Sequence, residues 1–393
     1  MENILVKNVT VLTMDKANRR FEGWCILRGG RIGALGEGQP PEDADCDQII
    51  DGAGGWLLPG LIDVHSHIGL YEDSLGFEGA DGNEDTDPIT PHLRALDGVN
   101  PMDRAFREAV EAGVTTVAVS PGSANPIGGQ IVAMKTCGRR IDDMILKEPL
   151  AIKFAFGENP KSVYHDKDET PVTRMATAAL IREHLFKAHE YMARKDIAHD
   201  DPDEDDPDFD LKLESLLPLM RGEIAAHFHA HRADDIFTAL RIAKEFQIKP
   251  VIVHGTEGHL VADLLAGEEV PVISGPSMTD RSKPELSNLT DRAPALLRAA
   301  GVETAITVDH PEIPIRLLMH AAMLAAKSGM SENDALRAIT IVPAEIAGLN
   351  KRVGSLEVGK DADCVLFDGH PFDYKSNVQA VFINGRQEYR RAL

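Results

Sequence analysis

The feature that most constrains the fold is an alternation of short, strand-like apolar runs with helix-like segments through the middle of the chain. Runs such as 115–120 (TTVAVS) and 250–255 (PVIVHG) are rich in β-branched residues and are too short to be typical helices. Between such runs lie segments such as 234–247 (DDIFTALRIAKEFQ), whose apolar residues recur at helical spacing behind two acidic residues. Alternation over roughly 290 residues predicts a parallel sheet with helical crossovers, and at this length a closed (β/α)8 TIM-like barrel.

The two ends of the chain differ from the middle, because both carry short strand-like runs separated by glycine-rich turns. Each end alone would be short of apolar core, so we expect the two ends to pair into one small β domain. The predicted organisation is a composite small β domain of residues 1–57 and 352–393, and a barrel of residues 58–351. The runs that support it are 4–13 and 25–36 near the start and 354–367 and 378–386 near the end.

Composition narrows the range of partners. The chain has 41 Lys and Arg against 63 Asp and Glu, a net charge of −22 at pH 7, whereas nucleic-acid binding needs clustered basic residues. No segment resembles a signal peptide, and no apolar run reaches the roughly 20 residues that span a bilayer. Four scattered cysteines without CxxC spacing indicate free thiols in a reducing compartment. We therefore expect a cytoplasmic protein with a small-molecule substrate, no nucleic-acid or membrane partner and, as a base-rate expectation, a homo-oligomeric state.

Histidine and aspartate residues mark the ends of several predicted strands. The functional groups of a (β/α)8 barrel gather at the carboxyl ends of its strands, so residues far apart in the sequence meet at one mouth. Four separate segments carry such residues: DVHSH (His65, His67), AHFHAH (His227, His229, His231), VIVHG (His254) and TVDH (Asp309, His310).

This combination of residues predicts a metal site. His65 and His67 are two positions apart, so in a strand both side chains point to the same face. Further imidazoles and a carboxylate complete a site for Zn²⁺ or another divalent metal, with one position left open for water. The metal lowers the pKa of the bound water towards about 7, which gives a hydroxide nucleophile at neutral pH. Asp309 would accept the proton of that water and pass it to the leaving nitrogen.

The three histidines of AHFHAH share one face of a strand, so alternation does not choose among them. Depth favours His229, because a metal ligand should lie near the end of the strand. His231 would then lie in the following loop and contact the substrate, whereas His227, deeper in the barrel, would be structural.

Two segments carry a resemblance to a known family. LLPGLIDVHSH (57–67) resembles the opening strand of the amidohydrolase superfamily, where a PG-x-ID-x-H-x-H run supplies two metal ligands. The tail, 354–373 followed by VFINGR (381–386), is similar to the end of imidazolonepropionase-like members and their dipeptidase and carboxypeptidase relatives. The resemblance implies a distorted (β/α)8 barrel with a small β-sandwich domain built from both termini.

The resemblance also assigns metal ligands by position. His65 and His67 match the first-strand pair, His229 the fifth-strand ligand, His254 the sixth and Asp309 the eighth-strand aspartate that also acts as base and acid.

The fourth-strand ligand stays open. Lys153, in AIKFAFG, fits the lysine that CO₂ converts to a carbamate, an anionic ligand that bridges two metals. Glu158, in GENP, is the competing ligand, and a lysine salt-bridged inside the barrel is the third interpretation. The choice decides between one ion and two.

Loop residues supply candidates for substrate binding. They are Gln130 in PGSANPIGGQ, Tyr164, Arg174 in TPVTRM as a bidentate partner for a carboxylate, and His231. An ordinary turn is an equal alternative for the loop of Gln130, and a structural ion pair is an equal alternative for Arg174.

The function predicted from these residues is metal-dependent hydrolysis of a C–N bond (amide, lactam or peptide-like) in a small amino-acid-derived substrate. A deaminase of a small heterocycle would use the same nucleophile and is the alternative within enzymes. A non-catalytic scaffold is the alternative outside them.

Overall fold

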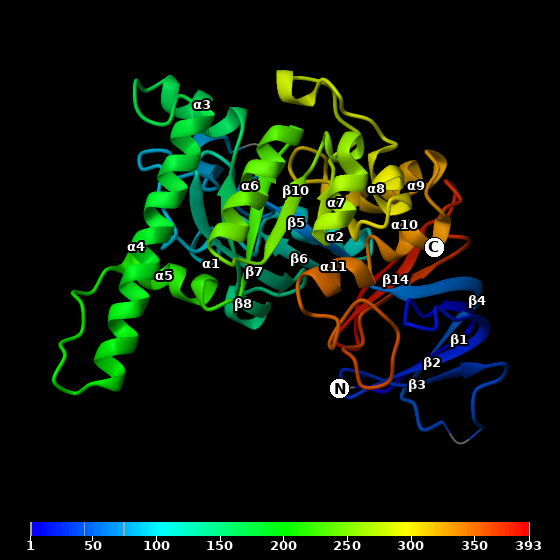
Figure 1. The fold of residues 1–393 in the computed structure, drawn as a ribbon. Helices are drawn as coiled ribbons and strands as arrows, with labels where there is room; N and C mark the ends of the chain where they lie inside the picture. The colour runs from blue at the N-terminus through cyan, green and yellow to red at the C-terminus, as the bar shows by residue number, and fades with distance from the viewer. Residues whose placement is uncertain (1, 43, 74, 393) are drawn as a thin grey trace.

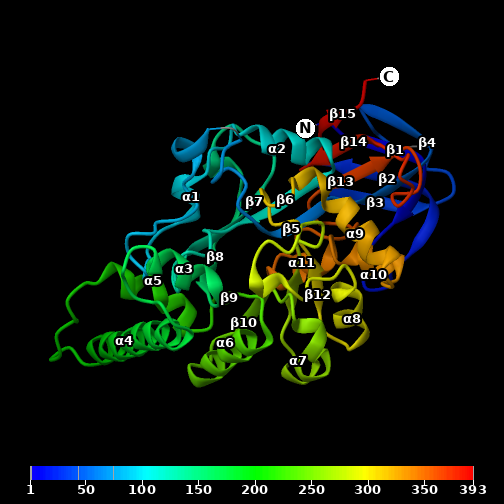
Figure 2. The same ribbon diagram turned by 90° about the horizontal axis from the view of Figure 1, so that it is seen from above.

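The computed structural model describes residues 2–42, 44–73 and 75–392, and it divides their strands between two sheets. An eight-stranded sheet forms the barrel and a seven-stranded sheet forms the small domain. Figures 1 and 2 show the small sheet at one end of the molecule together with both termini, and the long helix α4 (Arg174–Asp200) at the other end. The predicted fold class, a distorted barrel with a small β-sandwich domain from both termini, is confirmed.

The barrel sheet has the order β12-β11-β10-β9-β8-β7-β6-β5. Its strands are β5 (Leu61–Ser66), β6 (Val114–Val119), β7 (Ile127–Lys135), β8 (Ile145–Ala155), β9 (Ala225–Ala230), β10 (Pro250–His254), β11 (Val272–Ser274) and β12 (Thr304–Ile306).

One strand departs from the predicted parallel arrangement. β7 runs antiparallel to both β6 and β8, whereas the other barrel pairs are parallel. The connections on either side of β7, 120–126 and 136–144, contain no α-helix. Short connections join antiparallel strands, whereas parallel strands need a long crossover, so the chain returns through β7 as a hairpin.

Helices cover the outside of the barrel (Figure 1). In α6 (Ala233–Glu245), Ile236, Leu240 and Ala243 are buried and two acidic residues occupy the first turn, as the spacing predicted. The other α-helices are α1 (Ala95–Gly98), α2 (Arg104–Glu111), α3 (Glu158–His165), α5 (Leu211–Met220), α7 (Ala262–Glu268), α8 (Ala293–Ala299), α9 (Leu318–Lys327), α10 (Glu332–Arg337) and α11 (Ile341–Ile346). Short 3-10 helices are η1 (Gly76–Gly79), η2 (Ile141–Asp143), η3 (Gly258–Val261), η4 (Pro284–Leu286) and η5 (Ile315–Leu317). Among the described residues, none of the helices combines the length and apolarity that a membrane span requires.

The small sheet combines strands from both ends of the chain in the order β15-β14-β13-β4-β1-β2-β3. β4 pairs in parallel with β1 and antiparallel with β13, so it joins the N-terminal strands to the C-terminal ones. Val6, Cys25, Leu57, Cys364 and Phe382 lie in a core of its own. The strands are β1 (Ile4–Leu12), β2 (Arg20–Arg28), β3 (Arg31–Glu37), β4 (Gln48–Pro59), β13 (Cys364–Phe367), β14 (Val378–Ile383) and β15 (Arg386–Arg390). The predicted domain limits at 57/58 and 351/352 stay predictions.

A buried ion-pair cluster joins the barrel to the small domain. Lys135, the last residue of β7, contacts Asp363 and lies 3.1 Å from an Asp361 carboxylate oxygen, and all three side chains are buried. Asp361 also pairs with Arg31 and Arg352. Because β7 is antiparallel, Lys135 lies at the end of the barrel opposite the strand ends that carry the histidines.

We expect Lys135→Met to lower the free energy of unfolding by about 3 kcal/mol, because it leaves the buried carboxylate of Asp363 without its ammonium partner. Urea unfolding checks this. Lys135→Met combined with Asp363→Asn should lose less, and Arg107→Met, which removes an exposed ion pair, should stay near the wild-type value. A single variant no less stable than Arg107→Met would contradict the role of this cluster.

Candidate metal centre

Side chains at four strand ends of the barrel converge on one cavity. His67, His229, His254 and Asp309 line it, and His65 lies beneath them, completely buried. His254 and Asp309 have positive φ angles of 72° and 54°. Non-glycine residues rarely adopt this conformation, and such strain is concentrated at functional sites.

The first group of these side chains surrounds the carboxylate of Asp309. His65 Nε2 and His67 Nε2 lie 3.2 and 3.3 Å from Asp309 Oδ1, and His254 Nδ1 lies 4.0 Å from Oδ2. Ligand atoms of His65, His254 and Asp309 all lie within 4.8 Å of one another. The spacing is that of a single ion site.

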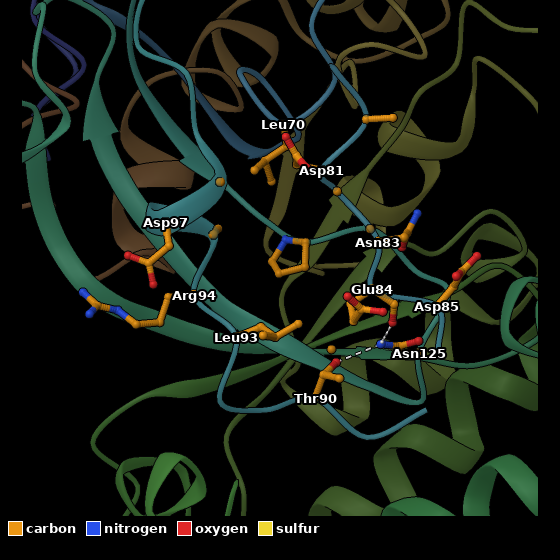
Figure 3. Close-up of a pocket in the computed structure, with 18 of the residues that line it drawn as sticks. Leu70, Asp81, Asn83, Glu84, Asp85, Thr90, Leu93, Arg94, Asp97 and Asn125 are labelled. Carbon is orange, nitrogen blue, oxygen red and sulfur yellow. Dashed lines mark hydrogen bonds between the residues drawn. The ribbon is translucent and has the colours of Figure 1, made fainter. Parts of the chain in front are cut away.

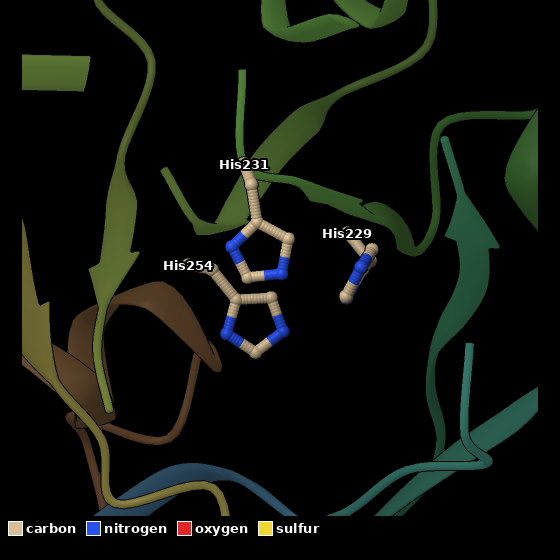
Figure 4. A group of neighbouring side chains, drawn as sticks. All are labelled: His229, His231 and His254. Carbon is tan, nitrogen blue, oxygen red and sulfur yellow. The ribbon is translucent and has the colours of Figure 1, made fainter. Parts of the chain in front are cut away.

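The second group shares His254 with the first. Ligand atoms of His229, His231 and His254 also lie within 4.8 Å of one another. The rings of His231 and His254 are stacked with centroids 4.7 Å apart, and His229 stands edge-on beside them (Figure 4). The two groups share one imidazole and therefore lie side by side.

Hydrogen bonds to the backbone orient two of the imidazoles. His67 Nδ1 lies 2.6 Å from the Ser120 carbonyl oxygen and His254 Nδ1 lies 2.7 Å from the Gly275 carbonyl oxygen. A carbonyl oxygen only accepts, so each Nδ1 carries the proton and each Nε2 keeps its lone pair for a metal.

The protonation states suit metal binding. Burial lowers the pKa of His65 and of His254 to about 3, and it lowers the pKa of His229 and of His231 well below the usual value. Burial by itself would raise the pKa of Asp309, but the imidazoles around it hold that pKa well below its usual range. At pH 7 these four histidines are therefore neutral and Asp309 is ionised, as ligands must be.

The polar atoms at the centre make no well-formed hydrogen bond with the described residues, although His65 Nε2 and His67 Nε2 lie 3.2 and 3.3 Å from Asp309 Oδ1. Both ring nitrogens of His65, Nδ1 of His229, Nζ of Lys153 and Oδ1 of Asp309 are buried, and the part of the chain that the structure describes offers them no hydrogen bond. Leaving buried polar groups unpaired costs stability, and a divalent cation takes such nitrogen and oxygen ligands. The residues present therefore fit a metal centre.

The two fourth-strand candidates lie in different places. Lys153 is completely buried in β8, and burial lowers its pKa to about 8. No carboxylate among the described residues forms an ion pair with Lys153, so the salt-bridge interpretation finds no partner. Glu158 begins α3, and its backbone N–H donates to Glu285 Oε2 over 2.9 Å. It lines a separate cavity, together with Lys161 and Arg174, and the structure does not bring it to the histidines.

Of the residues predicted to bind substrate, His231 alone lines the cavity. Gln130 belongs to β7, and its side-chain amide lies 3.4 Å from the Pro91 carbonyl oxygen. The Tyr164 hydroxyl is buried and donates to Asn125 Oδ1. Arg174 Nε donates to both carboxylate oxygens of Asp235 over 2.9 and 3.0 Å, as its structural alternative predicted. The side chains of Gln130, Tyr164 and Arg174 are thus hydrogen-bonded to protein groups outside the cavity.

Sequence reasoning missed several residues that line the cavity, whose volume is about 360 Å³. Most of them lie in loops after the strands, where no periodic pattern indicates which side chains turn inward, and Asn159 lies in the first turn of α3. These residues include Tyr71, Asn83, Ser123, Asn159, Lys283 and Glu312.

A second cavity of about 630 Å³ adjoins the first and shares Asn83 and Gly122 with it. Figure 3 shows its wall, where Asn125 donates to the Glu84 carbonyl oxygen and to Thr90 Oγ1. The lining carries several acidic side chains, and the segment between β5 and α2 supplies most of it. His67, His229, His254 and Asp309 line the smaller cavity, and none of the candidate ligands lines this larger one.

Comparisons with known proteins agree with this geometry. The structure superposes on the crystal structure of an amidohydrolase from Thermotoga maritima MSB8 with a TM-score of 0.95 and 45% identity, over 99% of this chain and 100% of that one. Amidohydrolase tasK of Hapsidospora irregularis is 28% identical over 96% of this chain, which spans 41% of that protein. Imidazolonepropionase of Alkaliphilus oremlandii is 22% identical over 93% of this chain and 92% of its own length.

The family model described as "Amidohydrolase family" matches residues 56–387, which include both strand-end groups and the C-terminal strands of the small domain up to the start of β15. The resemblance seen in LLPGLIDVHSH and in the tail is confirmed, and with it the assignment to a metal-dependent hydrolase. The chain belongs to the amidohydrolase family.

Proposed function

We propose that this protein hydrolyses a C–N bond (amide, lactam or peptide-like) in a small, amino-acid-derived substrate. The observation that carries the proposal is that buried imidazole nitrogens meet the carboxylate of an ionised aspartate at the end of a barrel, where several of these atoms make no well-formed hydrogen bond with the described residues. The size of the cavity supports a small substrate. The four free cysteines support a cytoplasmic location.

The proposed centre holds one or two divalent ions, Zn²⁺ being the first candidate. His65, His67 and Asp309 would hold one ion, and His229 and His254 the other. Lys153 would complete the second site as a carbamate, since a lowered pKa increases the neutral amine that reacts with CO₂. When bound, a divalent cation polarises the scissile carbonyl and makes a coordinated water acidic.

The protein's own groups carry the proton. Asp309 is ionised, and its Oδ1 contacts the Nε2 atoms of His65 and His67 without a well-formed hydrogen bond, so it can accept a proton and return it to the leaving nitrogen. His231 is fixed by a 2.7 Å contact between its Nδ1 and Thr256 Oγ1, and its ring lines the cavity beside His254. It is the candidate for contact with the substrate carbonyl.

A substrate panel tests the proposal. Zinc-loaded protein is assayed with dipeptides, N-acyl amino acids, hydantoins, imidazolones and aminopyrimidines, with amine, carboxyl and ammonia followed separately. We expect ring opening or amide cleavage. Ammonia release from an aminopyrimidine alone would instead identify a deaminase, and protein purified without chelator that holds no metal would indicate a scaffold.

Metal binding should stabilise the fold, because a ligand that binds the native state alone shifts unfolding by mass action. We expect Zn²⁺ at a hundredfold excess over its Kd to raise the Tm of chelator-treated protein by about 3 °C or more. His254→Ala should lose most of this increase because His254 belongs to both groups. His320→Ala, at an exposed position outside the cavity, should keep it. An equal increase in both variants would contradict the assignment of His254.

Asp309→Asn should retain most of the bound metal, because the histidines remain, yet lower kcat by about 100-fold or more through loss of the proton acceptor. Turnover is measured on the best substrate of the panel and metal content by mass spectrometry. Asp142→Asn, which alters an exposed ion pair, serves as the control. Wild-type turnover in Asp309→Asn would remove the proposed proton role.

A further inference from the structure

The cavity beside the histidines contains one basic side chain that the chemistry described above does not use. Lys283 precedes η4, on the segment that follows β11, and it lines the cavity together with Asn159 and Ser123. We propose that Lys283 and Asn159 form an anion subsite that binds a carboxylate of the substrate. The inference rests on the proposed function and deepens it, because it restricts the substrates to small amides that carry a free carboxylate.

Hydrogen bonds hold the Lys283 ammonium beside the second histidine group. Lys283 Nζ donates to Asn159 Oδ1 over 2.8 Å. The amide nitrogen of Asn159 donates to Ser123 Oγ over 2.7 Å and lies 3.5 Å from His229 Nε2. Through Asn159 the ammonium is therefore linked to His229, a proposed metal ligand, without contacting it directly.

The Lys283 ammonium has N–H donors that its hydrogen bond to Asn159 does not use. A lysine has three N–H donors, and the hydrogen bond to Asn159 uses one of them. Lys283 is only partly buried, and no ion pair within 4.0 Å joins it to a carboxylate of the described residues. An anion that enters the cavity can therefore take up the remaining donors without first displacing an acidic side chain.

Other basic side chains do not compete for this role. Among the described residues that line the cavity, Lys283 is the sole lysine or arginine. Arg174, the residue that the sequence favoured for a carboxylate, is occupied by Asp235 and lines the separate cavity that contains Glu158. Lys153 is completely buried in the barrel and is absent from the cavity lining.

The distribution of charge favours one orientation of such a substrate. Glu312 also lines the cavity, and its backbone N–H donates to the Asp309 carbonyl oxygen, so two carboxylates mark the Asp309 side. A substrate carboxylate is repelled there. The acidic group near the Lys283 side is the buried Glu285, whose Oε1 lies 3.7 Å from His231 Nε2, but Glu285 lines the separate cavity, so the Lys283 ammonium attracts the substrate carboxylate within this one. The scissile bond then lies between, over the histidines, within reach of Asp309.

Paired metal-binding probes test the subsite without a known substrate. Malonic, succinic and glutaric monohydroxamic acids each carry a zinc-chelating group and a carboxylate at a different distance, and their methyl esters are matched neutral controls. Binding to zinc-loaded protein is measured by calorimetry. For at least one length we expect the acid to bind wild-type protein roughly tenfold or more tightly than its ester, because charge-assisted hydrogen bonds are the stronger ones.

Variants then locate the effect. Lys283→Met should abolish the preference for the acid while leaving the Kd of the ester unchanged, and Lys283→Arg should keep most of it. Lys161→Met, which removes a lysine from the neighbouring cavity, is the matched control. Zinc content and circular dichroism confirm that each variant is folded and loaded, and the wild-type comparison of acid with ester stands even if Lys283→Met does not fold.

The outcomes separate the two proposals. Esters that bind while no acid gains affinity, or a preference that survives in Lys283→Met, would overturn the subsite and leave the metal centre intact. If neither acids nor esters bind zinc-loaded protein, the metal centre itself fails and the subsite with it.

Discussion

The site depends on the contact between the first barrel strand, β5, and the segment that follows the last strand, β12, which we call the seam. Asp63, completely buried in β5, accepts hydrogen bonds from His65 N–H on its own strand and from Val308 N–H across the seam, each 3.1 Å long. The Thr307 hydroxyl donates to the His65 carbonyl oxygen, and His67 N–H donates to the His310 carbonyl oxygen. These bonds set Asp309 beside His65 and His67. Burial raises the pKa of Asp63 to about 7, so the carboxylate that closes the seam is itself costly to keep charged.

The same region concentrates features that do not favour folding. His254 and Asp309 have left-handed backbone conformations, and buried polar atoms of His65, His229 and Asp309 make no well-formed hydrogen bond with the described residues. Each feature costs stability, and together they are tolerated because two extensive apolar cores pack around the barrel. A cation at the centre would supply the missing partners of the nitrogens and oxygens at once. The strain is therefore better explained by ligand binding than by the fold alone.

Sequence reasoning predicted best the residues whose positions are set by the geometry of the strands. His65, His67, His229, His254 and Asp309 follow apolar runs, and the register of parallel strands brings their ends together, so their convergence could be expected without coordinates. The antiparallel course of β7 was missed because its apolar run has no local mark of direction. The absence of a helix on either side was the available signal.

Residues outside the strands were predicted poorly, for a physical reason. Arg174 has the right chemistry for a carboxylate, but Asp235, from a different helix, occupies its guanidinium, and no local pattern announces a pairing between residues 61 positions apart. Lys283 lies among prolines, serines and acidic residues, a composition that predicts an exposed loop. Its hydrogen bond to Asn159 joins residues 124 positions apart, which no local pattern indicates.

Strands and loops therefore contribute differently to what this protein does. The pairing of the barrel strands fixes the positions of the candidate ligands. Proteins with the same barrel can therefore hold ligands at the same positions even at low sequence identity, such as the 22% identity to an imidazolonepropionase over 93% of this chain. The loops after the strands fix which molecule reaches those ligands. The Lys283 ammonium, linked to His229 through Asn159, changes which substrate charge is preferred. It does so without moving the atoms that carry the chemistry, because it contacts Asn159 and not the candidate ligands. Family membership therefore predicts the reaction class of this chain, and the loop that carries Lys283 is where its substrate is selected.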